Sequence, residues 1–495
     1  MAEEYLDIFA GGEWITGHSG EVFEDRNPAN RDDLIGTFAR GDSVDVNECV
    51  EAAVCAYPSW AATPSPQRAD YVLRVGLLLE QRKEELSQLM AREMGKTLKE
   101  CRADVQEGID FAFFMAGEGR RMYGVTTRSE LPNKFSMTVR HPIGPAGLIT
   151  PWNFPIAIPT WKLFPALISG CTVVFKAAED TPLCALRLVQ MFEEVGLPGG
   201  VLNFVTGYGE EAGAALVSHD GIKCVSFTGS LEVGRMIASR CGQAMKRCSL
   251  ELGSKNIMIV MPDANLDLAV EAGAWGAFAT SGQRCTATSR IAVHGSIMPE
   301  YRERFLARVG TMKVGPGTDP STELAAVINE KQKARILDYI AIGEKEGAKV
   351  LTGGHPLEDG EYAKGAFIAP TVFDEMTPDM RIAQEEIFGP VTGFIEIGSV
   401  EEAVAVANST KYGLSAAIYT HDVPNAFKAI EGLEFGVVYV NAATIGAEVQ
   451  LPFGGMKATG NGHREAGPTA LDEFTEWKAV SVDFSGKVQK AQGLD

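Results

Sequence analysis

The feature that most constrains the fold is an alternation of apolar runs and amphipathic stretches that begins near residue 143. The expected strands are GPAGLIT (144–150), CTVVFKA (171–177), VLNFVTG (201–207) and CVSFTGS (224–230). Helical patterns separate them, for example IPTWKLFPALISG, which ends at Gly170. Strands that alternate with helices across short connections form parallel sheets. The sequence therefore predicts an α/β fold.

The chain is too long for a single compact core. It has 495 residues, of which 45% are hydrophobic, and chains of this length divide into domains. A second alternating block covers about 265–450, and residues 44–118 carry apolar residues at helical spacing. Two strand-like stretches, KFSMTVR (134–140) and TEWKAVSVDF (475–484), belong to neither block. We expect at least two α/β domains and a smaller β-rich part.

Charge and cysteine content exclude several classes of protein. The net charge of −20 argues against a nucleic-acid surface, which needs a basic stripe. Nine cysteines without a C-x-x-C pair predict neither a disulfide framework nor a metal site, and favour a reducing compartment such as the cytoplasm. The uncharged run 142–161 is long enough to span a membrane, but its five prolines would break a helix. We interpret it as buried core, with no membrane partner.

Two turns are candidate nucleotide-binding elements, although no G-x-G-x-x-G or Walker motif is present. In FTGSLEVG, Gly229 and Ser230 stand between a strand and a helix, where backbone N–H groups and the helix dipole can hold a pyrophosphate. In FKAAEDTP, Lys176 and Glu179 follow a strand and could bind ribose hydroxyls. A capped helix and a solvated loop are the simpler alternatives, and the residues alone favour them.

One cysteine is a candidate nucleophile. Cys285 lies in SGQRCTATSR, and none of the seven histidines is clearly paired with it. Cysteine nucleophiles need a base or a lowered thiol pKa. Glu251, in ELGSKN, is the nearest plausible base. A buried, inert cysteine is the alternative.

Eight stretches, taken in order, resemble the aldehyde dehydrogenase superfamily over nearly the whole chain. They are PWNFP (151–155), WK (161–162), FKAAEDTP (175–182), FTGS (227–230), ELGSKN (251–256), GQRCT (282–286), EEIFGPV (385–391) and LPFGG (451–455). The resemblance implies oxidation of a small-molecule aldehyde to a carboxylic acid through a cysteine thiohemiacetal and a thioester. It also overrides the simpler alternatives given above.

The same resemblance implies roles for individual residues. Cys285 corresponds to the nucleophile, Glu251 to the residue that activates water, and Asn153 to a donor in the oxyanion hole. The cofactor-binding positions are Trp152, Lys176, Glu179, Gly229, Ser230, Glu386 and Phe388. Lys162 and Glu465 match residues that are sometimes assigned to a proton relay. A carboxylate at Glu179 favours the ribose hydroxyl of NAD over the phosphate of NADP, although NADP stays open.

The resemblance further implies a three-part layout. A Rossmann-like cofactor domain would comprise residues 1–121 and 143–253, and an α/β catalytic domain residues 254–452. Segments 122–142 and 470–495 would form a small β oligomerisation flap and give a homodimer or a homotetramer. This layout would explain the two strand-like stretches that stand outside both blocks.

The substrate is the least constrained part of the analysis. In similar enzymes that act on anionic aldehydes, an arginine before the nucleophile binds the anion, so Arg284 favours an ω-semialdehyde. The alternative is an arginine paired with an internal acid. Phe154, Trp161 and Phe453 would line the tunnel, and Gln106, Asp110 and Phe113 would face it from a helix. A broad-specificity aldehyde dehydrogenase, an acyltransferase and a non-catalytic protein with this fold are the competing functions.

Overall fold

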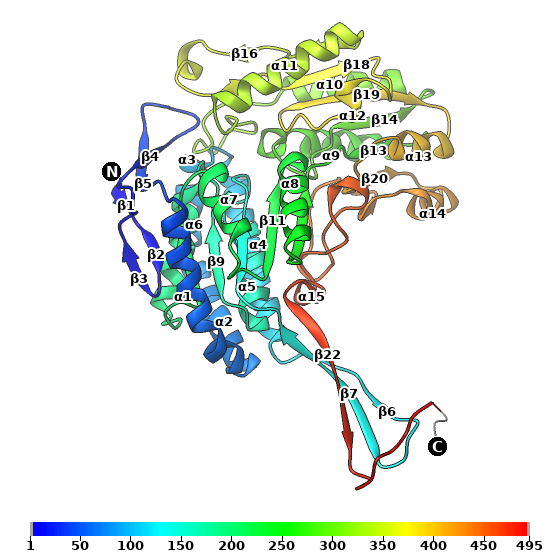
Figure 1. The fold of residues 1–495 in the computed structure, drawn as a ribbon. Coiled ribbons are helices and arrows are strands. Elements are labelled where there is room, and N and C mark those ends of the chain that lie inside the picture. The colour runs from blue at the N-terminus through cyan, green and yellow to red at the C-terminus, as the bar shows by residue number, and fades with distance from the viewer. Residues whose placement is uncertain (1–2, 493–495) are drawn as a thin grey trace.

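The computed structural model describes residues 3–492. Within that range the chain forms two α/β units, one above the other, and a β-sheet arm that projects from the lower unit (Figure 1). The α/β fold expected from the sequence is confirmed. The last three residues of the expected 470–495 segment, and the first two of 1–121, lie outside the described residues.

The lower unit is built around a sheet whose strand order is β12-β11-β8-β9-β10-β2-β3. Its strands are β2 (Ile8–Ala10), β3 (Glu13–Ile15), β8 (Ala146–Ile149), β9 (Val173–Lys176), β10 (Leu202–Val205), β11 (Cys224–Gly229) and β12 (Arg247–Leu252). The strands from β8 to β12 pair in parallel, as their helical connections require. The strands β2 and β3 extend the sheet in antiparallel fashion.

Helices cover both faces of this sheet. They are α1 (Ser43–Ala62), α2 (Ser65–Gln81), α3 (Lys83–Glu93), α4 (Leu98–Glu118), α5 (Ala157–Ser169), α6 (Pro182–Glu194), η1 (Gly209–Gly213), α7 (Ala214–Ser218) and α8 (Leu231–Gln243). The uncharged run 142–161 forms β8, the loop after it and the first turn of α5, and most of its residues are buried. In α5 every residue except Ile158 is buried. The helix ends at Gly170, whose φ of 100° is a left-handed conformation that glycine adopts without strain. The expectation of buried core is therefore confirmed.

The N-terminal region contains strands that the sequence patterns did not indicate. A small sheet of order β1-β5-β4 comprises β1 (Glu3–Leu6), β4 (Val22–Arg26) and β5 (Leu34–Ala39). RCSLEL forms the strand β12, and residues 209–218 form the π-helical turn η1 followed by α7.

The upper unit has a second sheet of order β15-β18-β19-β14-β13-β20-β21. Its strands are β13 (Ile257–Val260), β14 (Arg290–His294), β15 (Lys349–Thr352), β18 (Thr371–Asp374), β19 (Val391–Ile397), β20 (Ser415–Tyr419) and β21 (Val437–Val440). Its helices are α9 (Leu266–Phe278), η2 (Ala279–Gly282), α10 (Met298–Gly310), α11 (Glu330–Glu346), α12 (Arg381–Gln384), α13 (Val400–Asn408) and α14 (Val423–Gly432). A short hairpin, β16 (Pro356–Leu357) and β17 (Phe367–Ile368), flanks η3 (Gly360–Tyr362).

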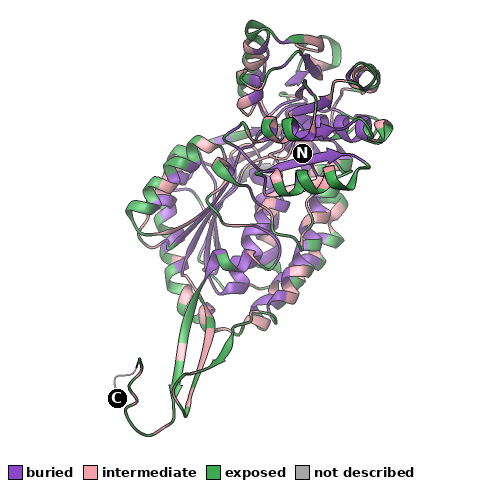
Figure 2. Cartoon of the chain, turned by 90° about the vertical axis from the view of Figure 1, so that its right-hand side faces the viewer, coloured by how far each residue is buried: buried purple, intermediate pink, exposed green. Residues whose placement is uncertain are grey.

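The projecting arm pairs two segments that are far apart in sequence. The strand β7 (Lys134–Pro142) lies between β6 (Thr126–Arg128) and β22 (Thr475–Asp483), all antiparallel. The turn η4 (Lys457–Thr459) and the helix α15 (Ala470–Phe474) lead into β22. Both strand-like stretches expected at 134–140 and 475–484 are confirmed. Most of the arm is exposed or half-buried (Figure 2).

The two sheets present opposite strand ends to the space between them. In the lower sheet the carboxyl ends of β8, β9, β11 and β12 lead to Asn153, Lys176, Ser230 and Gly253. In the upper sheet Cys285 precedes β14 and Glu386 precedes β19. Carboxyl ends of parallel strands are the usual place for ligands in open α/β sheets. No helix within residues 3–492 is long and apolar enough to cross a membrane.

Candidate active site

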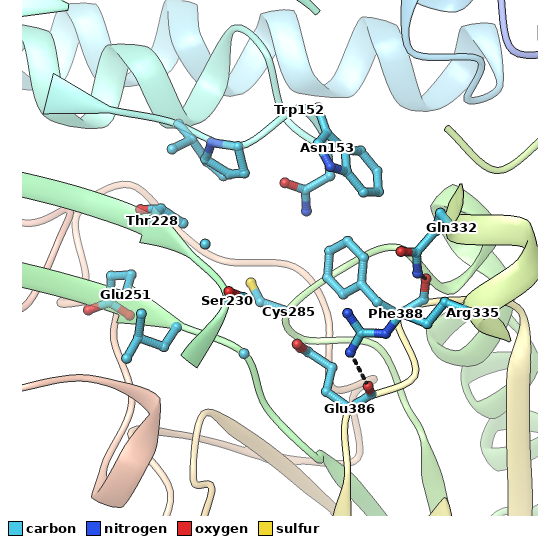
Figure 3. A pocket seen from close by; sticks show the side chains of 15 residues that line it. Trp152, Asn153, Thr228, Ser230, Glu251, Cys285, Gln332, Arg335, Glu386 and Phe388 are labelled. Atoms are coloured by element: carbon cyan, nitrogen blue, oxygen red, sulfur yellow. Dashed lines mark hydrogen bonds between the residues drawn. The ribbon is translucent and has the colours of Figure 1, made fainter. Parts of the chain in front are cut away.

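A cavity of about 160 Å³ lies where the two sheets meet, and Figure 3 shows its lining. Its walls are Pro151, Trp152, Asn153, Ile158, Thr228, Gly229, Ser230, Glu251, Leu252, Gly253, Cys285, Gln332, Arg335, Glu386 and Phe388. The structure therefore brings the three expected catalytic residues into one cavity with five of the seven expected cofactor positions. Lys176 and Glu179 are not part of this wall.

Cys285 lies in a constrained loop. Thr280 and Ser281 have φ values of 53° and 54°, a left-handed conformation that is unfavourable for residues other than glycine. Asn256 Nδ2 holds the loop by donating to the carbonyl oxygens of Cys285, at 2.7 Å, and of Ala287, at 2.9 Å. Burial raises the pKa of the Cys285 thiol, and the nearby carboxylates Glu386 and Glu251 add to this effect. The thiol is therefore protonated at rest and needs a proton acceptor before it can attack.

Glu251 is a buried carboxyl group on β12 with an unusual environment. Neither of its oxygens has a hydrogen-bond partner among the described residues. Burial, followed by the charge of Glu465, raises its pKa well above the usual range, whereas Lys162 opposes the shift. A carboxylate with a raised pKa is a stronger base and can accept a proton near neutral pH.

Asn153 follows β8 and its side-chain amide is oriented across the boundary between the two units. Its Nδ2 donates to the carbonyl oxygen of Gln283 at 2.9 Å. An amide nitrogen carries two protons, so one N–H stays available to a developing oxyanion. The backbone of Asn153 is fixed as well, because Lys96 Nζ donates to its carbonyl oxygen at 3.0 Å and to Asp104 at 2.6 Å.

The opposite wall has the properties of a nucleotide site. The rings of Trp152 and Phe388 meet edge to face, with centroids 5.4 Å apart. Glu386 accepts a hydrogen bond of 2.9 Å from the backbone N–H of Ser254, and burial raises its pKa to about 7. Ser230 caps α8 by accepting a bond from Val233 N–H, as the sequence predicted. The N-terminus of α8 therefore opens into the cavity and can bind an anion.

Lys176 and Glu179 lie outside the main cavity but form a compact polar pair. Lys176, at the end of β9, is almost fully buried, and its Nζ lies 3.0 Å from Glu179 Oε2. Glu179 is partly exposed and borders a neighbouring cavity with Asp180 and Asn329. The strand β9 pairs with β8, which in turn pairs with β11, so Lys176 lies at the same end of the parallel strands as Ser230.

Arg284 is not part of the wall of the cavity that holds Cys285. Its Nε donates to Thr280 Oγ1 at 2.9 Å, and its guanidinium group covers the Phe154 ring at 5.0 Å. Its terminal nitrogen lies 3.8 Å from Glu100, which is too far for a hydrogen bond. Among the described residues only its Nε donates a hydrogen bond.

Two sets of residues were expected to line the substrate tunnel: aromatic side chains and one face of α4. Trp161 and Phe453 pack edge to face at 5.1 Å, beside the cavity rather than in its wall. On α4, Gln106 accepts from Lys83 and donates to Asp110. Gln106 and Asp110 thus face α3 and solvent, so the expectation that they face the tunnel is wrong. The reason is that Gly108 packs against Ile156 on the other side of α4.

Comparison with known proteins identifies the family. The family model described as "Aldehyde dehydrogenase family" matches residues 14–480. The chain belongs to the aldehyde dehydrogenase family. It is therefore an oxidoreductase that acts on an aldehyde. The alternative function, a non-catalytic protein with this fold, is not supported.

Individual aldehyde dehydrogenases cover the whole chain. It is 41% identical over 478 residues to the α-ketoglutaric semialdehyde dehydrogenase of Bacillus subtilis (97% of this chain, 98% of that protein). It is also 41% identical to human retinaldehyde dehydrogenase 3 (98% and 94%). Among solved structures, betaine aldehyde dehydrogenase from Staphylococcus aureus in complex with NAD⁺ superposes with a TM-score of 0.95 at 32% identity (98% and 95%). The fold class is confirmed.

Sequence reasoning missed residues that position the aldehyde dehydrogenase site without belonging to its motifs. Lys96 and Asp104 fix the Asn153 loop, and Glu100 binds Thr280 in the nucleophile loop through its Oε1 while it caps α4 through its Oε2. Only the capping pattern T-x-x-E at 97–100 is visible in the sequence. The cross-domain contacts are long-range and have no local signal.

Proposed function

We propose that the enzyme oxidises an aldehyde carrying an anionic group, an ω-semialdehyde, to the carboxylic acid with NAD. The observation that carries this proposal is the convergence of Cys285, Glu251 and Asn153 on one cavity. The naming of relatives as semialdehyde dehydrogenases supports the substrate class. A broad-specificity aldehyde dehydrogenase is the second candidate, because retinaldehyde dehydrogenases are equally similar.

In this proposal the Cys285 thiol releases its proton to water and attacks the aldehyde carbon, and the Cys285 backbone N–H and Asn153 Nδ2 bind the oxyanion that forms. Donors fixed before the reaction stabilise such charge most effectively. Loss of the hydride from this adduct leaves the Cys285 thioester, and Glu251 then takes a proton from the water that hydrolyses it. Hydrolysis breaks the C–S bond, releases the carboxylic acid and restores the thiol.

The residues present fit a nicotinamide dinucleotide. Gly253 leaves room for the Glu386 carboxylate, since a Cβ at Gly253 would lie 2.1 Å from Glu386 Oε2. Glu386 would bind the nicotinamide ribose, the α8 N-terminus with Gly229 and Ser230 the pyrophosphate, and Lys176 with Glu179 the adenosine ribose. Trp152 and Phe388 would flank the cofactor. NAD, when bound, supplies the hydride acceptor.

The carboxylate at Glu179 favours NAD over NADP. It can accept hydrogen bonds from ribose hydroxyls but repels a 2′-phosphate. Lys176 offsets part of that repulsion. The NAD⁺ in the betaine aldehyde dehydrogenase structures agrees with this choice.

Arg284 is the proposed anion-binding group. Both oxygens of Glu100 already accept hydrogen bonds, Oε1 from Thr280 and Oε2 from Thr97. Arg284 is within ion-pair distance of Glu100, but its terminal nitrogens donate no hydrogen bond among residues 3–492. In this proposal they donate to a substrate carboxylate, which a planar guanidinium binds well. Phe154, Trp161 and Phe453 would form the apolar part of the tunnel.

We also propose a function for each part of the chain. Residues 1–121 and 143–253 would bind NAD, and 254–452 would carry the nucleophile. The segments 122–142 and 470–495 would join subunits in a homodimer or homotetramer, which would cover the exposed Trp477, Val482 and Phe484 of the arm. The nine unpaired thiols suit a reducing compartment such as the cytoplasm.

NADH formation from matched aldehydes tests the proposal. Wild type, Arg284→Met and Cys285→Ala are compared on 2,5-dioxopentanoate, succinic semialdehyde and pentanal with NAD and with NADP. We expect kcat/KM to favour the anionic aldehydes, to lose that preference in Arg284→Met, and to vanish in Cys285→Ala. An equal rate on pentanal in wild type and no change of preference in Arg284→Met would support the broad-specificity enzyme.

A further inference from the structure

A group of buried carboxyl side chains lies on the sheet of the lower unit, beneath the cavity. Glu251, Glu465 and Glu473 are each at most 3% exposed. The cation among them is Lys162, whose Nζ is bonded to Glu465 and, at 2.8 Å, to Ser226 Oγ. Glu473 comes from α15, at the root of the projecting arm (Figure 1). The catalytic scheme above uses Glu251 and leaves Glu473 without a role.

The sheet register arranges these groups in two rows. Thr228 of β11 pairs with Glu251 of β12, and two residues earlier Ser226 pairs with Ser249. Residues two apart on a strand point to the same face, so all four side chains lie on one surface, with the rows about 7 Å apart. Thr228 Oγ1 donates to Glu465 at 3.4 Å. Glu465 therefore covers the upper row, and Lys162 connects it to the lower row.

Glu473 covers the lower row. Neither of its carboxylate oxygens has a hydrogen-bond partner within the described range 3–492, although the Ser226 and Ser249 hydroxyls lie close enough to lower its pKa. Ser249 Oγ is likewise buried without a partner. The other groups that act on Glu473 electrostatically are Lys162 and Glu465. Glu473 in turn raises the pKa of the Cys224 and Cys248 thiols.

The charge balance requires a proton in this group. Three buried carboxylates share one buried lysine, and the only other cation that acts on Glu251 among the described residues is Arg464. Burying unpaired charge is unfavourable. Lys162 is committed to Glu465. Burial raises the pKa of Glu473 to about 7, and that of Glu251 well above its usual range. Carboxyl groups that interact this strongly take up and release protons as a group rather than one by one.

We propose that Glu473 is the buried proton acceptor at the inner end of a proton path that serves Glu251 during thioester hydrolysis. This inference rests on the proposed function. Water attacks the thioester carbon, the C–O bond forms and the bond to Cys285 Sγ breaks. The proton of that water goes to Glu251, and the network of Glu465, Lys162, Ser226 and Ser249 passes a proton on to the Glu473 carboxylate. Glu473 does not touch the substrate in this proposal. It is a positioning residue that acts through Glu251, because it holds the proton that Glu251 gives up.

Hydrolysis can be measured without cofactor. p-Nitrophenyl acetate acylates the reactive thiol and releases p-nitrophenolate in a burst, and the later steady rate reports hydrolysis of the acyl-enzyme. We compare wild type, Glu473→Gln, Glu251→Gln and the double variant between pH 6 and 9. Glu476→Gln, an exposed glutamate three residues further along, is the matched control. NADH formation with succinic semialdehyde is measured in parallel.

The proposal predicts that Glu473→Gln keeps the burst but hydrolyses the acyl-enzyme about tenfold more slowly. This is less than the loss of a general acid–base group itself, about 10²–10⁴-fold, because Glu473 acts through Glu251. The rate of Glu473→Gln should also lose the dependence on pH near 7, and the double variant should be no slower than Glu251→Gln. Glu476→Gln should match wild type. Wild-type hydrolysis with an unchanged pH profile in Glu473→Gln would overturn the proposal, as would an equal loss of burst and hydrolysis.

A second variant decides the matter if Glu473→Gln does not fold, as judged by thermal unfolding. Ser249→Ala removes the neighbouring hydroxyl and leaves the carboxylate in place. Slower hydrolysis with a retained burst supports the path, and unchanged hydrolysis overturns it. Failure of the proposed function is a distinct result: no NADH would form from any aldehyde, whatever the ester measurements show.

Discussion

The side-chain amide of Asn153 donates a hydrogen bond of 2.9 Å to the backbone carbonyl of Gln283, two residues before the nucleophile. This bond connects the loop after β8 in one unit to the nucleophile loop of the other. It orients one amide proton away from the reacting centre and leaves the second free. The position of Asn153 and that of Cys285 are therefore set together.

Replacing Asn153 by alanine should remove an oxyanion donor. We expect kcat/KM to fall by about 10²–10³-fold, or about 3–4 kcal/mol, as for the loss of one such donor in other enzymes. The affinity for NAD, measured by fluorescence titration, should change little. A variant that retains most of its activity would show that Asn153 does not contact the oxyanion.

Gly253 should be required for cofactor binding through Glu386. Any Cβ there would lie 2.1 Å from Glu386 Oε2, so Gly253→Ala must displace that carboxylate. We expect the KM for NAD to rise by about tenfold or more, which corresponds to about 1.4 kcal/mol of binding. Gly242→Ala on α8 is the control, because a Cβ at Gly242 meets nothing within 4 Å. Equal KM values in the two variants would contradict the role of Glu386.

Glu179 should control the choice between NAD and NADP. Replacement by serine removes the carboxylate that repels a 2′-phosphate and leaves Lys176 to attract it. We expect the NADP-to-NAD ratio of kcat/KM to rise by about tenfold or more. Steady-state kinetics with both cofactors measure this ratio, with Glu210→Ser as an exposed control on η1. An unchanged ratio would show that Glu179 does not contact the adenosine ribose.

The stability of the enzyme should fall as pH rises from about 4.5 to about 8. Burial and the charge of Asp104 raise the pKa of Glu107 from 4.5 to about 8. A carboxyl group with a raised folded-state pKa favours folding fully below its unfolded pKa, and this contribution is lost as pH rises through the folded value. Glu107→Gln should therefore gain in unfolding temperature relative to wild type between pH 5 and 8.5. A pH-independent difference would contradict the shift.

Local patterns in the sequence were sufficient for much of the fold. Serine is a residue type favoured at N-caps, and Ser230 caps α8. The apolar runs at 171–177 and 201–207 contain β9 and β10. These features depend on residues close together in the chain. The N-terminal strands were not predicted because they are short. The strands β2 and β3 extend the main sheet, whereas β1, β5 and β4 form a small sheet of their own, so their stability comes from tertiary pairing.

The site was less accessible to sequence reasoning than the fold. The resemblance of motifs such as GQRCT and ELGSKN supplied Cys285 and Glu251, whereas spacing alone favoured an inert cysteine. Arg284 shows the limit: its neighbour Cys285 faces the cavity, but its own side chain points to Glu100, 184 positions earlier. Such long-range contacts leave no local pattern.

Mass spectrometry of a trapped acyl-enzyme tests the central claim most directly. Glu251→Gln, incubated with NAD and succinic semialdehyde, should complete oxidation but not hydrolysis. The account predicts one acyl group per chain, on the peptide that contains Cys285, with stoichiometric NADH. An adduct on another of the nine cysteines, or NADH turnover by Cys285→Ala, would contradict it.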